Sequence, residues 1–378
     1  MITSMSSSNA IPVILHVDDN PEALTAWQSV VDNSGKARLL LRHPHDVEKQ
    51  DLESASLLLV DVKLESWPQR DELQSLSLKP RNGLALLAIL QEHVHEMGKA
   101  RPCAFALYTG AIPSIARGLV PQSHLVARAH NLEWVINKAQ DVQLRLHQAL
   151  ELAAAVQALP LDWPGETPED AEAAVKSWLG MVDTMSWAPQ AWRSVSRCHP
   201  PTHEFAEHTR GVALLRWLLH RILPYPCFLL DDVHLAARLR VRPESLRRSL
   251  AIGSKLSLAL ESVAYRGQCG NFHGRRWWRV GLESWVYDLA KEDPSSIELL
   301  HEKLRALDAS LEFSEFPVVV PILNERYEFE SDLVSIDDAV LVQPDDWPPY
   351  ADHAWTSREL AKDENVLRAI VVREQDGY

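Results

Sequence analysis

Short apolar segments alternate with helical patterns through the first 150 residues of the chain. Runs typical of buried strands lie at 13–17, 37–41, 56–60, 103–108 and 133–137, the last being the weakest. Apolar residues at helical spacing fill 83–96 and 141–155, and Asn20 followed by Pro21 predicts the start of a further helix. Strands that alternate with helices indicate an α/β fold built on a parallel sheet.

Polar side chains stand where four of these runs end. They are Asp18 and Asp19 after the first run, Asp61 after the third, Thr109 after the fourth and Lys138 after the fifth. Because the carboxyl ends of parallel strands meet at one edge of a sheet, we expect these residues to share a crevice. The three carboxylates could hold Mg²⁺, which takes oxygen ligands, and Asp61 is the candidate nucleophile for an aspartyl phosphate. Lys138 would neutralise charge on a transferring phosphoryl group, and Thr109 would offer that group a hydroxyl.

With these residues the chain resembles the receiver domain of two-component response regulators over roughly residues 12–150. The matching residues are Val17-Asp18-Asp19, Leu57-Leu58-Leu59-Val60 before Asp61, Thr109-Gly110, and Lys138. The resemblance implies a flavodoxin-like, doubly wound sheet, bound Mg²⁺ and a conformational response through Thr109. It also implies phosphorylation of Asp61 by a histidine kinase or a small phosphodonor, and it makes a homodimer a candidate assembly.

Two features depart from the pattern of that family. Asp61 and Thr109 are 48 positions apart, longer than receivers usually show, and the excess reads as an inserted loop at 65–82. Ala139 follows Lys138, where receivers favour Pro. A degenerate receiver that serves as a scaffold and is never phosphorylated is therefore the alternative. We prefer an active site, because all five polar roles are filled.

A second region of interest spans 230–250, where we predict two short helices joined by a tight turn. Small apolar residues form the inner face of the first helix, Val241 fills the corner, and Pro243 opens the second helix. The segment resembles the helix-turn-helix of bacterial transcription factors, whose second helix enters the major groove of DNA. Such proteins usually have Gly at the turn, where φ is positive, and this chain has Arg240 there. A helical hairpin with a solvated basic face is the alternative.

Arginines supply the candidate DNA contacts in this half of the chain. They are Arg242, Arg247 and Arg248 near the second predicted helix, and Arg275 and Arg276 in a segment rich in glycine and aromatic residues at 265–279. That segment could form a wing beside the helices, although at least one of Trp277 and Trp278 is expected in the core. If DNA is not the partner, we expect the helical region to bind proteins. No catalytic constellation emerges there, so we expect no chemistry beyond phosphorylation of Asp61 and loss of the phosphoryl group.

Length and charge complete the expectations. The 378 residues are 46% hydrophobic and 24% charged, which is typical of a globular chain of two or three domains. We expect a flexible leader at 1–11, a receiver-like domain at 12–158, a linker at 159–169, and at 170–378 an effector region that is mainly helical with some strands. The net charge of −14 argues against a protein that coats nucleic acid, yet residues 228–279 carry a local +6 and the acidic part at 281–378 a local −15.

Four scattered cysteines fit a reducing compartment. No apolar run reaches the ~18 residues of a membrane helix, and the N-terminus lacks the features of a signal peptide. We therefore expect a cytoplasmic protein that has no membrane partner.

Overall fold

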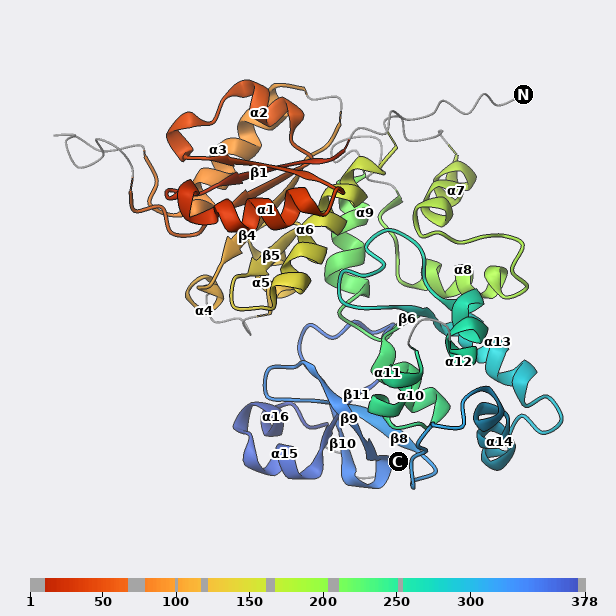
Figure 1. Ribbon diagram of the computed structural model, residues 1–378. Helices are drawn as coiled ribbons and strands as arrows, with labels where there is room; N and C mark the ends of the chain where they lie inside the picture. The colour runs from red at the N-terminus through yellow and green to blue at the C-terminus, as the bar shows by residue number, and fades with distance from the viewer. Residues whose placement is uncertain are drawn as a thin grey trace, which may run out of the picture. The chain divides into compact units, whose positions relative to one another are not determined.

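A parallel sheet organises the first part of the protein in the computed structural model (Figure 1), which describes residues 11–66, 79–98, 101–116, 122–160, 167–202, 211–250 and 254–372. The chain divides into two units. The first comprises Met1–Ala171 and Pro201–Arg216, and the second Glu172–Pro200 and Trp217–Tyr378. The predicted linker at 159–169 lies mostly outside the described residues, and α7 (Pro168–Trp178) begins at its end.

The five strands of the sheet are β1 (Val13–Val17), β2 (Arg38–Arg42), β3 (Leu57–Val60), β4 (Ala104–Thr109) and β5 (Trp134–Asn137). All neighbours are parallel, in the order β2-β1-β3-β4-β5. The helices of this unit are α1 (Thr25–Asn33), α2 (Lys49–Ser54), α3 (Gly83–Glu96), α4 (Ile112–Ile115), α5 (Ser123–Ala129) and α6 (Val142–Gln157). This alternation and strand order confirm the predicted flavodoxin-like, doubly wound sheet.

Both faces of the sheet are buried, which explains why its strands read as continuous apolar runs. Alternate strand residues such as Leu15, Val17 and Leu58 pack into one core with side chains from α2 to α5. The residues between them, such as Ile14, are equally buried, and α1 and α6 cover the other face of the sheet (Figure 1).

The turn after β1 differs from the prediction that Asn20 caps a helix. Asn20 precedes a 3₁₀ turn at Pro21–Leu24, its side chain caps nothing, and α1 begins only at Thr25. The backbone N–H of Asn20 donates instead to Asp18 Oδ1 at 2.8 Å. Asp18 therefore stabilises the turn that follows it, as aspartates commonly do.

The extra length between β3 and α3 is closed at its base. Lys63 bridges Asn82 in antiparallel fashion, Leu64 N–H donates to the Arg81 carbonyl at 3.0 Å, and Gly83 N–H to the Val62 carbonyl at 2.8 Å. Of the predicted insertion at 65–82, positions 67–78 lie outside the described residues. This pairing joins the two ends of the insertion between β3 and α3.

The second unit is mainly helical with several two-stranded sheets, as predicted. Its helices are α8 (Ala188–Arg197), α10 (Asp232–Leu239), α11 (Pro243–Ser249), α12 (Lys255–Leu260), α13 (Arg279–Leu289), α14 (Ile297–Leu307), α15 (Arg358–Asp363) and α16 (Asn365–Ala369), while α9 (Val212–Trp217) runs from the first unit into a π-helical turn at Leu218–Ile222. The strand pairs are β6 (Leu229–Leu230) with β7 (Trp277–Trp278), β8 (Val319–Leu323) with β9 (Phe329–Ser335), and β10 (Ala339–Val342) with β11 (Ala354–Ser357). Both tryptophans of β7 are buried, so this part of the predicted wing belongs to the core.

The predicted helix pair at 230–250 is present as α10 and α11. Arg240, at the position where Gly was expected, adopts φ 56° and ψ 40° and ends α10 in the left-handed conformation. The corner is covered by a later segment, because Val241 bridges Phe313 and Arg242 N–H donates to the Glu312 carbonyl at 2.8 Å. None of the helices in the described part of the chain has the length and apolar character that a bilayer crossing requires.

Candidate functional site

Three of the five predicted site residues meet at the carboxyl edge of the sheet. Lys138 Nζ lies 2.8 Å from Asp61 Oδ2 and 3.7 Å from Asp18 Oδ2. Thr109 is buried at the end of β4, and its carbonyl accepts from the backbone N–H of Lys138 at 2.9 Å. The Thr109 Oγ1 accepts from the Ala111 N–H at 3.0 Å. The Lys138 ammonium is therefore shared between the carboxylates of Asp18 and Asp61. Thr109 is linked to Lys138 by a backbone hydrogen bond.

Asp18 is the most enclosed of the carboxylates, at 5% exposure. Burial raises its pKa, and the nearby charges of Asp61 and Asp19 add to the rise, while the Asn20 N–H and Lys138 oppose it. A further cation beside Asp18 would stabilise its charged form, because the carboxylate charge is only partly balanced. The Asp61 Oδ1 has no hydrogen-bond partner in the described part of the chain, so that oxygen is free for chemistry.

Asp19 is turned toward the segment that follows β3. Its Oδ2 accepts the backbone N–H groups of Glu65 and Ser66, both at 2.7 Å. The carbonyl of Ser66 is in turn 3.2 Å from the Nε2 of His43. The second aspartate of the pair therefore anchors the start of the insertion in this conformation.

Close packing of the α3 start against Asp61 requires a glycine. A Cβ on Gly83 would lie 1.9 Å from the backbone oxygen of Asp61. Asn82 caps the helix by accepting from Leu84 N–H at 2.9 Å, which sets its N-terminus at this point. Gly83 thus fixes how near the helix approaches the candidate nucleophile. Sequence reasoning marked it only as a helix start.

An aromatic cluster that sequence reasoning missed lines the inner side of the lysine. Lys138 Nζ lies 5.3 Å from the Tyr108 ring centre, and Tyr108 stacks on Trp27 with centroids 5.6 Å apart. Arg145 donates to the Tyr108 hydroxyl and lies over both rings. His16 meets Tyr108 edge-on, and burial together with the charge of Lys138 lowers the pKa of His16 to about 3. The only hint was a tyrosine at the end of an otherwise apolar strand.

The donor set fits a hard divalent cation. Each of Asp18, Asp19 and Asp61 keeps one carboxylate oxygen without a hydrogen bond to the described residues. Among those residues, no three His, Cys, Asp or Glu side chains are grouped tightly enough to hold a metal ion by themselves. Mg²⁺ usually takes one or two carboxylates and completes its shell with water, which suits Asp18 and Asp61.

The predicted DNA-contact arginines have different surroundings. Arg276 is 8% exposed, and its guanidinium donates to the carbonyls of His273, Arg275 and Leu223 at 2.8, 3.0 and 3.1 Å. The Arg276 guanidinium is therefore engaged in hydrogen bonds inside the protein and is not available for contact with DNA. Arg275 is exposed and donates to the Leu250 carbonyl at 3.0 Å, and Arg247 is exposed with no ion pair in the described part of the chain.

Carboxylates surround the other two arginines. Arg242 lies 3.6 Å from Glu315 and 4.0 Å from Glu312, and Arg248 pairs with Glu312 at 2.5 Å. A groove of about 450 Å³ at the start of α11 is lined by Glu244, Glu312, Glu315 and Asp332 as well as Arg242. The N-terminal residues of a recognition helix must face DNA, and four carboxylates there would repel phosphates.

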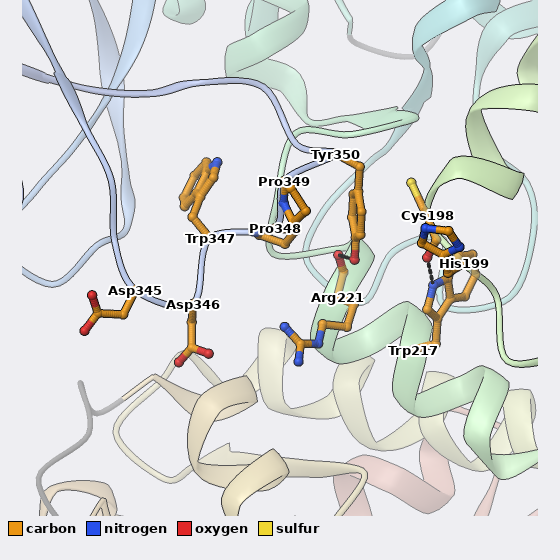
Figure 2. A pocket seen from close by; sticks show the side chains of 10 residues that line it. All are labelled: Cys198, His199, Trp217, Arg221, Asp345, Asp346, Trp347, Pro348, Pro349 and Tyr350. Atoms are coloured by element: carbon orange, nitrogen blue, oxygen red, sulfur yellow. Dashed lines mark hydrogen bonds between the residues drawn. The ribbon is translucent and has the colours of Figure 1, made fainter. Parts of the chain in front are cut away.

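Residues 345–350, which include Asp345 and Asp346, form a loop that lines another pocket of the second unit (Figure 2). Tyr350 donates its hydroxyl to the Arg221 carbonyl at 3.3 Å, and Trp347 is buried against Tyr225. On the opposite wall Trp217 donates to the Cys198 carbonyl at 2.8 Å. The two tryptophans are thus structural, and the acids Asp345 and Asp346 lie at the rim.

Comparisons with known proteins add nothing to what the sheet topology shows. No protein-family model matches the chain, and no curated protein matches it. Similar solved structures include a CheY-like receiver domain protein of Methanospirillum hungatei, at 15% identity over 39% of this chain and 98% of that one, with a TM-score of 0.27. A response regulator of Burkholderia pseudomallei with a phosphorylated aspartic acid, calcium and citrate matches at 14% identity over 56% of this chain and 98% of its own, with a TM-score of 0.23.

A third similar structure is RcsB of Salmonella enterica serovar Typhimurium bound to promoter DNA in the presence of phosphomimetic BeF3⁻. It is 13% identical over 55% of this chain and 98% of its own, with a TM-score of 0.25. At these values the fold assignment rests on the strand order itself: the N-terminal unit is a five-stranded, flavodoxin-like parallel sheet.

Proposed function

We propose that the first unit is a signal-receiving phosphoacceptor and that Asp61 is the residue phosphorylated. The observation that carries the proposal is the position of Lys138, whose Nζ lies 2.8 Å from Asp61 and 3.7 Å from Asp18 at the carboxyl edge of the sheet. A cation held against a carboxylate that has one free oxygen suits a site where negative charge must be accumulated.

The reaction would run at the free oxygen of Asp61. Oδ1 attacks the phosphorus of a small phosphodonor or of a phosphorylated histidine kinase, the bond from phosphorus to the donor's leaving group breaks, and the leaving group departs with the electron pair. Lys138 balances charge on the carboxylate and on the phosphoryl oxygens, and the Thr109 hydroxyl can donate to one of those oxygens. Mg²⁺ held by Asp18 and Asp61 would supply further neutralisation of the phosphoryl group, while Asp19 stays bound to the Glu65 and Ser66 N–H groups.

The test is to incubate the full chain with Mg²⁺ and acetyl phosphate and to measure intact mass. We expect one phosphoryl group on the wild type, removable by hydroxylamine, and none on Asp61→Asn. Asp170→Asn, an exposed carboxylate of the same unit, is the matched control and is expected to react as the wild type does. Equal phosphorylation of Asp61→Asn would refute the assignment, and no phosphorylation of the wild type would leave the scaffold alternative.

For the second unit we propose that the binding partner is a protein rather than DNA. The acidic groove at the start of α11 supports this order, because it surrounds the part of the helix that would have to meet the bases. DNA contact would rest on Arg247, Arg248 and Arg275. It predicts binding that weakens steeply with salt and that is lost in Arg247→Ala with Arg248→Ala, whereas a protein partner would be lost in Glu312→Gln with Glu315→Gln.

A further inference from the structure

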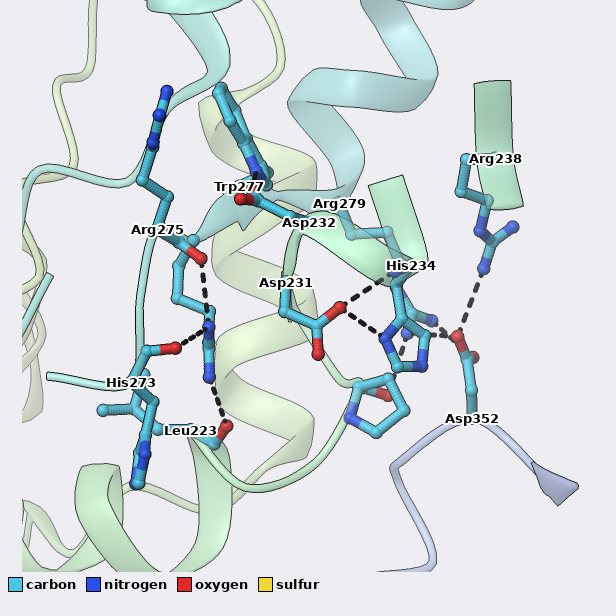
Figure 3. Close-up of polar contacts among 12 residues, drawn as sticks. Leu223, Asp231, Asp232, His234, Arg238, His273, Arg275, Trp277, Arg279 and Asp352 are labelled. Atoms are coloured by element: carbon cyan, nitrogen blue, oxygen red, sulfur yellow. Dashed lines mark hydrogen bonds and ion pairs between the residues drawn. The ribbon is translucent and has the colours of Figure 1, made fainter. Parts of the chain in front are cut away.

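The start of α10 holds a histidine–aspartate pair that the phosphoacceptor site does not use. Asp231 caps the helix, and its Oδ1 accepts both the backbone N–H and the ring Nδ1 of His234, each at 2.8 Å (Figure 3). The ring also meets Phe329 edge-on, with centroids 4.5 Å apart. The imidazole is therefore fixed in orientation, with Nδ1 directed at a carboxylate.

The other ring nitrogen is left open. His234 is only 7% exposed, and its Nε2 has no hydrogen-bond partner among the described residues. This nitrogen is nevertheless accessible to solvent, unlike the fully buried polar atoms that lack a partner. The residue lines a pocket of about 430 Å³ between α10 and the start of β8. Nε2 therefore reaches solvent through that pocket. Capping of the helix explains the contact at Nδ1 but not this open nitrogen.

The charged groups around the pocket favour an anion. Arg238, Arg240 and His353 line it together with His234. The carboxylate that lines it, Asp352, is already balanced (Figure 3): Arg279 reaches its two oxygens at 2.8 and 2.6 Å, and Arg238 lies at 3.2 Å. Glu283 lies 3.9 Å from Arg238 and is half exposed. The volume lies within the range of small-molecule sites, ~300–1,000 Å³.

We propose that this pocket binds a small oxyanion, the carboxylate or phosphate group of a low-molecular-weight ligand, between His234 Nε2 and the Arg238 guanidinium. Asp231 would hold the ring from behind at Nδ1, so that Nε2 points at the ligand and can donate to it whenever it carries a proton. Arg238 would contribute one N–H while keeping Asp352 as its other partner, since a guanidinium carries five donors. The proposal stands apart from phosphorylation of Asp61 and makes the second unit responsive to a metabolite.

The test is isothermal titration of the full chain with sodium phosphate, and separately with sodium acetate, at constant ionic strength kept with chloride. We expect saturable binding of at least one of them in the millimolar range, and which one binds tells a phosphate ligand from a carboxylate ligand. His234→Gln and Arg238→Gln are expected to bind at least about tenfold more weakly, the loss typical of one hydrogen bond to a charged group. Arg193→Gln, an exposed arginine of α8 outside the pocket, is the matched control and should bind as the wild type does.

A second readout covers a variant that fails to fold. In the wild type the His234 ring proton resonance, assigned by its loss in His234→Gln or by sequential assignment, should move on titration with the anion that binds. Absence of binding by both anions would overturn the proposal, as would binding without movement of that resonance. An equal loss of affinity in Arg193→Gln would mean that the anion responds to surface charge in general, and it would overturn the proposal too.

Discussion

The contact between Glu133 and Arg216 joins α9 to β5, the strand that leads to Lys138. Glu133 has no exposed surface. Its Oε1 accepts from Arg216 Nε at 2.5 Å, and its Oε2 accepts the backbone N–H of Phe105. Arg216 also donates to the carbonyl of Asn131 at 3.1 Å. The perturbation is Arg216→Ala, which removes the Arg216 guanidinium from this buried carboxylate.

The expected loss follows from the burial of the carboxylate. Breaking one partner from a buried ion pair costs about 3–5 kcal/mol, and since the Arg216 side chain is 29% exposed we expect a value near ~3 kcal/mol. Burial already raises the pKa of Glu133 with Arg216 present, and losing the cation raises it further. An acid whose pKa is raised in the folded state contributes stability below its unfolded pKa, about 4.3, and loses it as pH rises through the folded value. The deficit of Arg216→Ala should therefore grow with pH.

The assay is hydrogen exchange by mass spectrometry on the full chain, read on peptides that cover β4 and β5. It is run at about pH 5 and about pH 8, both above the unfolded carboxyl pKa of about 4.3. The control is Arg216→Ala in a Glu133→Gln background, where the neutral amide should make the loss smaller and independent of pH. A deficit below about 0.5 kcal/mol at the higher pH, typical of an exposed pair, would refute the reasoning. So would an equal deficit in both backgrounds.

Three further changes test other parts of the structure. Gly83→Ala places a Cβ 1.9 Å from the Asp61 carbonyl oxygen, so we expect thermal unfolding to show a loss of ~1–3 kcal/mol in stability and Asp61 to be phosphorylated more slowly. The control is Gly98→Ala, at an open position with φ 58°, which should leave the phosphorylation rate unchanged. Burial alone would raise the pKa of Asp51, but its hydrogen bonds from Arg42 and from the Glu48 N–H lower it overall. Asp51→Asn should therefore destabilise the protein at neutral pH, and the difference in stability from the wild type should disappear as the pH falls through the lowered pKa. Arg240→Gly should raise stability by ~0.5–1 kcal/mol because φ is 56° there, and a lower midpoint in urea would show that the arginine side chain outweighs the backbone strain.

Local sequence patterns were sufficient to predict the strands of the first unit. Each apolar run became a strand within one or two residues of its predicted range, because both faces of a parallel sheet are buried and only apolar residues suit such strands. Asp18, Asp61 and Lys138 were brought to one edge because parallel strands all end there. The helix at 83–96 was predicted to the residue from its apolar spacing, and in the structure Asn82 caps its first turn.

Partners distant in sequence were decided by tertiary packing. Arginine-rich composition predicted a basic surface, yet Arg276 is buried against carbonyls and Arg242 and Arg248 face carboxylates about 64 to 73 positions away. Asp19 turned to the amides of the insertion, and Glu133 found Arg216 83 positions later. Side-chain periodicity along a chain encodes which face of an element is buried. It does not encode which charged group from another element meets a given residue, because that depends on how the packed elements are placed in space.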